Sequence, residues 1–178
     1  MIACDSTTYH NAYIGLGANL GNAQQSIRAA MNSLGNDSTT AAWSASSLYR
    51  SAPIQAEGPD FINAAMWIRT SLKPLALLHR LQQLEQDHGR QRTVQNAPRT
   101  LDLDLILYDT LQMNSPELIL PHPRMHKRRF VLAPLLELCA GLCVPGLGKI
   151  SDLLADVAGQ PLTPVCGAKP STRSGGER

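Results

Sequence analysis

Aromatic residues are scarce in this chain of 178 residues, and long apolar runs are absent from it. Phe, Trp and Tyr make up 4% of the sequence, which disfavours a single-stranded nucleic-acid module, because such modules stack bases on exposed rings. No stretch approaches the roughly 18 apolar residues of a membrane-spanning helix. The polar N-terminus also lacks the apolar segment of a signal peptide, so we expect a cytoplasmic protein without membrane contact.

Charge and cysteine content are equally unremarkable for a soluble protein. The formal net charge is +2 and the hydrophobic fraction is 43%, as in an ordinary globular chain. The length predicts one domain with a sizeable core, and we expect a monomer. The cysteines have no zinc-site spacing, and we expect buried, reduced thiols at Cys4, Cys139, Cys143 and Cys166.

The hydrophobic pattern predicts an α+β fold. Strands are expected over residues 12–21, 43–54, 60–70 and 100–109, with helices over 22–35 and 73–89. This order is that of a ferredoxin-like sandwich, an antiparallel sheet with helices packed on one face.

The remaining segments define the predicted domain limits. Two later helices are expected, one around Pro134 and one over 149–159. Residues 1–12 are interpreted as an N-terminal extension and 13–159 as the domain. Residues 160–178 lack apolar periodicity, which predicts a disordered tail.

The stretch "PRTLDLDLILYD", residues 98–109, places two aspartates in a predicted strand, although Asp is depleted in strands. Because side chains alternate, Asp102 and Asp104 share one face, with Cα atoms about 6.6 Å apart. Two such carboxylates can hold Mg²⁺ together with substrate phosphates. The structural alternative is a solvated acidic face. Leucines occupy the opposite, core-facing side at positions 101, 103, 105 and 107.

Two basic clusters favour the metal interpretation. Arg90, Arg92 and Arg99 precede the aspartates, and carboxylates beside arginines are typical of phosphoryl transfer. The second cluster, "HPRMHKRR", spans residues 122–129. Prolines at 121 and 123 argue against a helical zinc pair there. A solvated basic turn remains the alternative, but a polyphosphate clamp is the better interpretation beside the aspartates.

Other nucleotide motifs are missing. "GLGANLG" (15–21) has its third glycine one position too late for a dinucleotide fingerprint. "PGLGKI" (145–150) places Ile150 where a P-loop needs Ser or Thr. The chemistry would therefore be phosphoryl transfer without a P-loop.

Several segments occur together in a characteristic order: "YIGLGANLGN", "SLYRSAPI", "DFINAA", "LEQDHGR", "PRTLDLDLILYD" and "LPHPRMHKRRFVLAPL". With them the chain resembles the 6-hydroxymethyl-7,8-dihydropterin pyrophosphokinase family from about residue 13 to residue 155. The resemblance implies transfer of diphosphate from ATP, the co-substrate, to the hydroxymethyl group of the reduced pterin. AMP would be released, two Mg²⁺ ions would assist, and the product would serve folate biosynthesis.

The resemblance also implies roles for individual residues. Asp102 and Asp104 match the ligands of both Mg²⁺ ions, and the two Phe residues of the chain match rings that sandwich the pterin. The implied catalytic residues are Arg90, Arg99, Asp102 and Asp104. The implied pterin contacts are Ser51, Ile54, Phe61, Asn63 and Phe130. The implied ATP contacts are Glu85, Arg92, Arg99, His122 and Arg128.

Two rival functions remain at this point. A nucleic-acid-binding module could use the same element order, but the aspartates would repel phosphate unless metal is present. A catalytically inactive regulatory relative is disfavoured because Asp102, Asp104, Arg90, Arg99 and His122 are intact. We therefore expect small-molecule substrates and no nucleic-acid partner.

Overall fold

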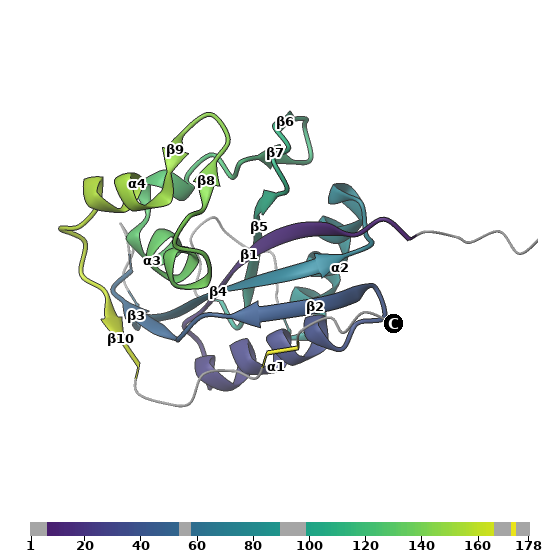
Figure 1. The fold of residues 1–178 in the computed structure, drawn as a ribbon. Helices are drawn as coiled ribbons and strands as arrows, with labels where there is room; N and C mark the ends of the chain where they lie inside the picture. Colours follow the sequence, from purple (N-terminus) through teal and green to yellow (C-terminus); the bar gives the residue numbers. More distant parts are fainter. Residues whose placement is uncertain (1–6, 54–57, 90–98, 166–171, 174–178) are drawn as a thin grey trace, which may run out of the picture.

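A computed structural model describes residues 7–53, 58–89, 99–165 and 172–173 (Figure 1). Its main sheet is antiparallel, with the order β10-β3-β4-β1-β5, and β2 also pairs with β4. This order confirms the predicted ferredoxin-like arrangement. The strands are β1 (His10–Ala18), β2 (Thr40–Ala45), β3 (Tyr49–Ser51), β4 (Phe61–Thr70), β5 (Asp102–Tyr108) and β10 (Thr163–Pro164).

The helices lie on both faces of the sheet, not on one as predicted. The helices α1 (Ala23–Gly35) and α2 (Pro74–Asp87) pack on the first face. The helices α3 (Arg129–Leu138) and α4 (Ile150–Asp156) pack with Ile106 and Leu107 on the second (Figure 1). The short elements are the hairpins β6–β7 (Met113–Asn114, Ile119–Leu120) and β8–β9 (Cys143–Val144, Gly148–Lys149), and the 3₁₀ turn η1 (Met125–Lys127).

Local sequence explains where the two largest helices begin. The Asn22 side chain accepts a hydrogen bond from the Gln25 amide at 3.2 Å, which satisfies one free N–H group of α1. The helix α2 begins with Pro74, whose missing N–H costs nothing in a first turn. Apolar stripes then face the sheet, and Ile27, Met31, Leu77 and Leu81 are each at most 1% exposed.

The leucines of β5 do not all face one core. Leu103 and Leu105 pack on the α1/α2 side, but Ile106 and Leu107 both pack on the α3 side. The β1–β5 register shifts between Tyr13 and Ile14, so one extra β5 residue is inserted there. This bulge reverses the alternation, and the prediction that Leu107 shares the face of the earlier leucines is wrong.

The predicted strand 43–54 is also interrupted by a bulge. The buried Ser46 lies between β2 and β3, and its hydroxyl accepts a hydrogen bond from the Ala65 amide at 2.9 Å. The Ser46 amide donates to the Ala65 carbonyl at 2.9 Å. The Ser46 hydroxyl thus takes the place of a backbone carbonyl as the acceptor for the Ala65 amide. On either side of this point, β2 and β3 both pair with β4.

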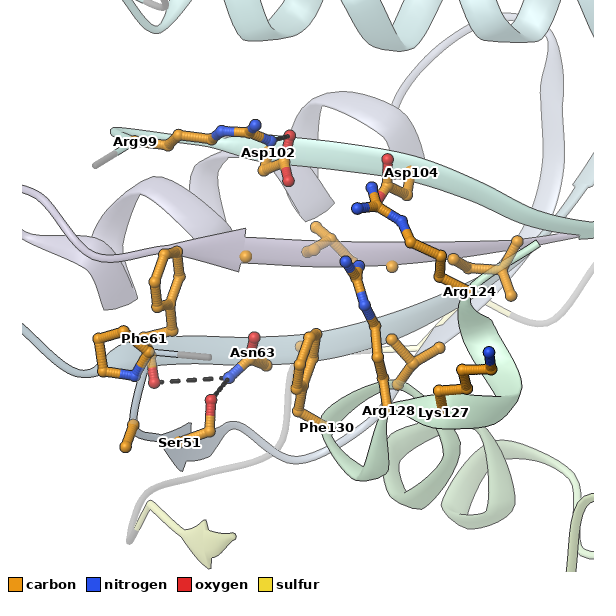
Figure 2. A pocket seen from close by; sticks show the side chains of 18 residues that line it. Ser51, Phe61, Asn63, Arg99, Asp102, Asp104, Arg124, Lys127, Arg128 and Phe130 are labelled. Carbon is orange, nitrogen blue, oxygen red and sulfur yellow. Dashed lines mark hydrogen bonds and ion pairs between the residues drawn. The ribbon is translucent and has the colours of Figure 1, made fainter. Parts of the chain in front are cut away.

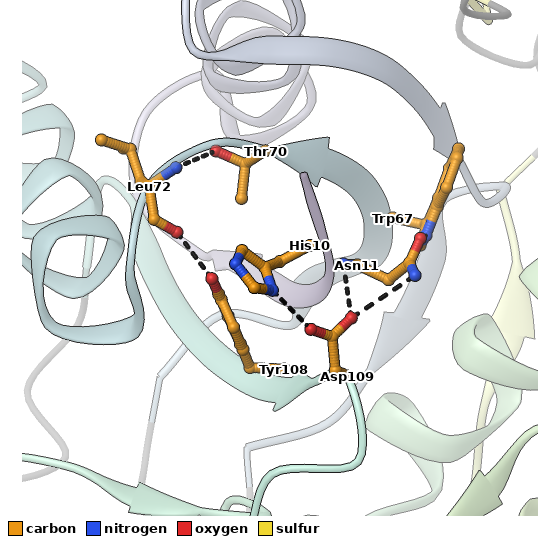
Figure 3. Close-up of polar contacts among 7 residues, drawn as sticks. All are labelled: His10, Asn11, Trp67, Thr70, Leu72, Tyr108 and Asp109. Carbon is orange, nitrogen blue, oxygen red and sulfur yellow. Dashed lines mark hydrogen bonds and ion pairs between the residues drawn. The ribbon is translucent and has the colours of Figure 1, made fainter. Parts of the chain in front are cut away.

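One end of β1 is fastened to its two neighbours by a polar network (Figure 3). Asp109, directly after β5, accepts from the Asn11 amide at 2.8 Å and lies 2.7 Å from His10 Nδ1. The Trp67 indole of β4 donates to Asn11 Oδ1 at 3.1 Å. These contacts tie three adjacent strands in one register. They also place His10 and Asn11, within the predicted N-terminal extension, in the sheet.

The predicted tail contributes to the sheet at four described residues. Thr163 and Pro164 pair with Arg50 and Tyr49, and the Val165 amide donates to the Leu48 carbonyl at 2.8 Å. Further on, Arg173 forms a bridge with Trp43. These residues therefore contact the sheet, while the predicted domain limits and the disordered tail stay predictions.

The two described cysteines are more exposed than predicted. Cys143 is exposed and Cys139 half-buried, so the expectation of buried thiols is wrong for both. Cys4 and Cys166 lie outside the described residues. Among the described helices, none has the length and apolarity needed to cross a membrane.

Removing the chain after Leu162 should lower stability. Strand β3 would lose its outer partner β10 and keep only β4, and the hydrogen bonds of Val165 and Arg173 to the sheet would be lost. We expect a loss of about 1–3 kcal/mol, at roughly 1 kcal/mol per net hydrogen bond. Urea unfolding of the full-length and shortened chains measures it. An unchanged midpoint and slope would show that these contacts contribute nothing.

Candidate active site

A cavity of about 460 Å³ opens on the sheet face that α3 covers, and we call it the main cavity (Figure 2). Strands β1, β4 and β5 form its floor, while η1 and the start of α3 form one wall. Its lining residues include Gly15, Gly17, Ser51, Phe61, Asn63, Arg99, Asp102, Asp104, Arg124, Lys127, Arg128 and Phe130.

The floor of the main cavity is bare backbone at Gly17, while the Ile106 side chain lies over Gly15. Gly17 pairs with Asn63 of β4 on one side and with Asp102 of β5 on the other. Gly15 likewise pairs with Ala65 and with Asp104. Cross-strand partners point to the same face of a sheet. Over Gly17 the cavity therefore separates the Asn63 amide from the Asp102 carboxylate, which lies two strands away.

The two predicted carboxylates both line the main cavity, which confirms that they share a face. Asp102 forms an ion pair with Arg99. Burial, together with the negative charge of Asp102, raises the pKa of Asp104 above its ordinary value. The charges of His122, Arg128 and Arg99 offset part of that increase. Two carboxylates facing one cavity form a site that favours cations.

Three further cations face the carboxylates without carboxylate partners of their own. No ion pair joins Arg124, Lys127 or Arg128 to another described residue. The Arg128 guanidinium lies 5.5 Å from the centre of the Phe130 ring, a cation–π contact. Burial and the nearby Arg124 charge lower the pKa of Arg128. The wall is therefore suited to an anion.

Arg124 and Lys127 were missed as site residues, although both belong to the basic motif. Each lies at one end of the turn η1, where the Lys127 amide donates to the Arg124 carbonyl at 3.2 Å. Side chains three residues apart in a 3₁₀ turn lie on the same side. Pro121 and Pro123 already indicated a tight turn in this segment. The three-residue spacing of Arg124 and Lys127 could then have predicted that both side chains lie on the same side of that turn.

The predicted pterin contacts gather at the other end of the main cavity. The Asn63 amide nitrogen donates to Ser51 Oγ at 3.0 Å, which fixes the orientation of the amide. The rings of Phe61 and Phe130 stand on either side of Asn63 (Figure 2). Ile54, also predicted here, lies outside the described residues.

His122 lies at a second cavity of about 270 Å³, on the far side of β5 from β1. Its Nδ1 accepts from the Arg124 amide at 3.3 Å, so the other nitrogen, Nε2, bears the proton of the neutral ring. His122 Nε2 lies 4.0 Å from Asp104 Oδ2. Asp104 lines both cavities and thus connects them. The lining of the second cavity is mixed. Apolar side chains, including Leu78, Leu105 and Ile119, alternate with polar ones, including Asp104, Ser115, Glu117 and His122.

Glu85, predicted to contact ATP, has a structural role in the described chain. It is 2% exposed, and its carboxylate accepts from the Leu103 amide at 2.8 Å. It therefore holds β5 between the two aspartates, and its contact with ATP stays a prediction. Arg90 and Arg92 lie outside the described residues.

Residues 13–140 match the family model described as 7,8-dihydro-6-hydroxymethylpterin-pyrophosphokinase. The chain belongs to this family. Two relatives carry the name 2-amino-4-hydroxy-6-hydroxymethyldihydropteridine pyrophosphokinase. The Bacillus subtilis protein is 43% identical over 129 residues, 72% of this chain and 77% of its own length. The Haemophilus influenzae protein is 38% identical over 148 residues, which cover 83% of this chain and 92% of its own length.

A solved structure of the family shares the fold. The Plasmodium falciparum HPPK-DHPS A437G protein with SDX-DHP matches with a TM-score of 0.70 at 13% identity. The match covers 86% of this chain but 46% of the Plasmodium chain. This chain therefore corresponds to less than half of that larger protein.

Gly17→Val should weaken binding of the flat substrate expected on the bare floor. A Cβ at position 17 meets only Asn63 Oδ1, at 3.7 Å, so the fold should tolerate it. A branched side chain would nevertheless occupy the cavity between Asn63 and Asp102. We expect at least about tenfold weaker pterin binding, equivalent to about 1.4 kcal/mol, measured by calorimetry. Unchanged affinity in a folded variant would contradict the proposed floor.

Asp104→Asn should stabilise the metal-free protein at neutral pH. Because folding raises the pKa of Asp104 above its ordinary 3.8, the folded state binds this proton more readily than the unfolded chain does. Stability is therefore lost as pH rises through the interval above 3.8, once the carboxylate ionises. The variant should melt higher than wild type at pH 7, but no higher at pH 3. Thermal melts in a chelating buffer test this, and a lower melting temperature at pH 7 would refute it.

Proposed function

We propose that this protein transfers diphosphate from ATP to the hydroxymethyl group of 6-hydroxymethyl-7,8-dihydropterin, releasing AMP, in folate biosynthesis. The observation that carries the proposal is the main cavity. It combines an aromatic and amide end with a carboxylate and cation end. Membership of the pyrophosphokinase family supports the same reaction.

The aromatic end suits a flat, neutral heterocycle. Phe61 and Phe130 offer ring faces for stacking, and the Ser51 hydroxyl accepts a hydrogen bond from the Asn63 nitrogen. The Asn63 oxygen is then available to accept a hydrogen bond from a ring N–H or amino group. A site that hydrogen-bonds such groups rejects analogues that lack them.

The charged end suits the triphosphate of ATP. We infer that the adenosine occupies the second cavity and that the phosphates reach the main cavity past Asp104, which lines both. His122 Nε2 and the Arg128 guanidinium would then contact phosphate oxygens. The leucines and Ile119 of the second cavity offer apolar contact to a base, and Ser115 and Glu117 add polar groups for its edge or for the ribose.

The donor set also fits Mg²⁺. Asp102 and Asp104 provide carboxylate oxygens on one face, and their mutual repulsion would be relieved by a cation. We propose two ions, held by these carboxylates, by phosphate oxygens and by water. When bound, Mg²⁺ would supply charge neutralisation on the phosphates.

The chemistry requires mostly orientation and charge from the protein. The pterin hydroxymethyl oxygen attacks the β-phosphorus of ATP and gives up its proton to solvent. The bond from that phosphorus to the oxygen bridging the α- and β-phosphates breaks, and AMP leaves with that oxygen. Asn63 and the two rings hold the attacking group, while Arg99 and Arg128 stabilise charge on the transferred group. The expected cytoplasmic location and monomeric state remain predictions.

The decisive assay incubates the protein with ATP, Mg²⁺ and the reduced pterin, and separates the nucleotides formed. AMP, in equal amount to pterin diphosphate, supports the proposal. ADP would indicate transfer of one phosphate. No turnover, combined with metal-independent RNA binding, would favour the nucleic-acid-binding alternative.

Asp102→Asn and Asp104→Asn should each reduce AMP formation by about 10²-fold or more, the magnitude expected when charge stabilisation worth several kcal/mol is lost. Both side chains line a cavity, so the fold should remain intact. Steady-state kinetics at saturating Mg²⁺, together with circular dichroism, measure both effects. Wild-type turnover in either variant would refute the metal assignment.

A further inference from the structure

The Gln160 side chain bridges the two peptide groups that flank Arg128. Its Oε1 accepts from the Arg129 amide at 2.9 Å, and its Nε2 donates to the Lys127 carbonyl at 2.9 Å. Those groups belong to the peptide bonds directly after and directly before Arg128. Gln160 is the first residue of the stretch 160–178, for which the sequence predicts a disordered tail. It also lies beyond residues 13–140, which match the family model.

Arg128 needs such support because it joins two helical segments without being helical itself. It ends η1 and precedes α3, with φ −130° and ψ 104°. The Arg128 side chain forms no capping hydrogen bond with the first amides of α3. The first amides of a helix lack partners within the helix, and Gln160 satisfies that of Arg129. One amide group thereby restrains both backbone torsions of Arg128.

The Arg129 side chain in turn binds the backbone of the segment that contains Gln160. Its Nη1 donates to the Ala158 carbonyl at 2.8 Å and to the Gln160 carbonyl at 2.7 Å. The segment after α4 and the junction of η1 with α3 thus hold each other through four hydrogen bonds. Ile150 of α4 also packs with Met125 of η1 in the same buried cluster, so the bracing segment has a fixed base.

We propose that Gln160 is a positioning residue that directs the Arg128 guanidinium into the main cavity. The inference rests on the proposed function, in which Arg128 contacts the phosphates of ATP. The amide and carbonyl of Arg128 are held by backbone hydrogen bonds to Met125, Val131 and Leu132. Without the bridge, the two flanking peptide groups would lose their restraint, and Arg128 would hold its orientation over Phe130 less firmly. Gln160 would then affect binding of the phosphates but not of the neutral pterin.

The test combines Gln160→Leu, Arg128→Gln and the double variant in a mutant cycle. Each is titrated calorimetrically with Mg²⁺ and α,β-methylene ATP, an analogue that cannot release AMP, and separately with 6-hydroxymethylpterin. We expect Gln160→Leu to weaken nucleotide binding about tenfold, or about 1.4 kcal/mol. Pterin binding should stay unchanged. The double variant should be no weaker than Arg128→Gln, because coupled residues are not additive.

Gln160→Glu provides a conservative comparison, since it keeps the acceptor for the Arg129 amide and loses the donor to Lys127. It should lose less nucleotide affinity than Gln160→Leu. Tyr108→Phe is the control for general destabilisation, because it removes a hydrogen bond to the Leu72 carbonyl at the opposite end of β5. This control should leave both affinities unchanged.

The outcomes separate this inference from the proposed function. Additive losses in the double variant, or equal losses for nucleotide and pterin, would overturn the positioning role of Gln160. Nucleotide affinity in Gln160→Leu equal to wild type would overturn it as well. Absence of AMP formation by the wild type would instead overturn the proposed function, whatever the variants bind.

Discussion

The pairing of β1 with both of its neighbours is the constraint on which the site depends. A shift of one residue in either pairing would turn Gly17 away from the main cavity and bring a bulky core side chain in its place. The register is fixed at the opposite end of β1, where Asp109 and Trp67 bind Asn11 from the two neighbouring strands. A polar network remote from the cavity thus determines which side chains face the substrates.

The electrostatics of the site follow from two separate parts of the chain. The carboxylates come from β5 in the ferredoxin-like core, while Arg124, Lys127 and Arg128 come from the segment that crosses to the other face. Before substrate binds, each group of like charges is only partly neutralised. Burial, together with these like charges, raises the pKa of Asp104 and lowers the pKa of Arg128. A magnesium-bound polyphosphate would satisfy both groups at once, because it presents cations to one and anionic oxygens to the other.

Much of this arrangement could be predicted because it depends on local patterns. The strand and helix order, the shared face of Asp102 and Asp104, and the helices at 22–35 and 73–89 all follow from periodicity and end signals. The bulges at Ser46 and Ile106 could not be predicted in this way. Each depends on a partner strand distant in sequence, and each reverses an alternation that looks regular along the chain.

The same limitation explains why the backbone contacts of Glu85 and Gln160 could not be predicted from the sequence. Both side chains stabilise backbone groups next to site residues, and such contacts leave no periodic signal in the sequence. Gln160 lies in a polar stretch whose composition resembles a disordered tail, yet four hydrogen bonds join it and its neighbours to the start of α3. Composition reports how little apolar surface a segment can bury. It does not report whether the rest of the fold presents unpaired peptide groups to that segment. Here the interruption between η1 and α3 creates those groups, and the interruption is needed because Arg128 must face the cavity while α3 packs on the sheet. The order of the segment after α4 is therefore a consequence of the geometry of the site.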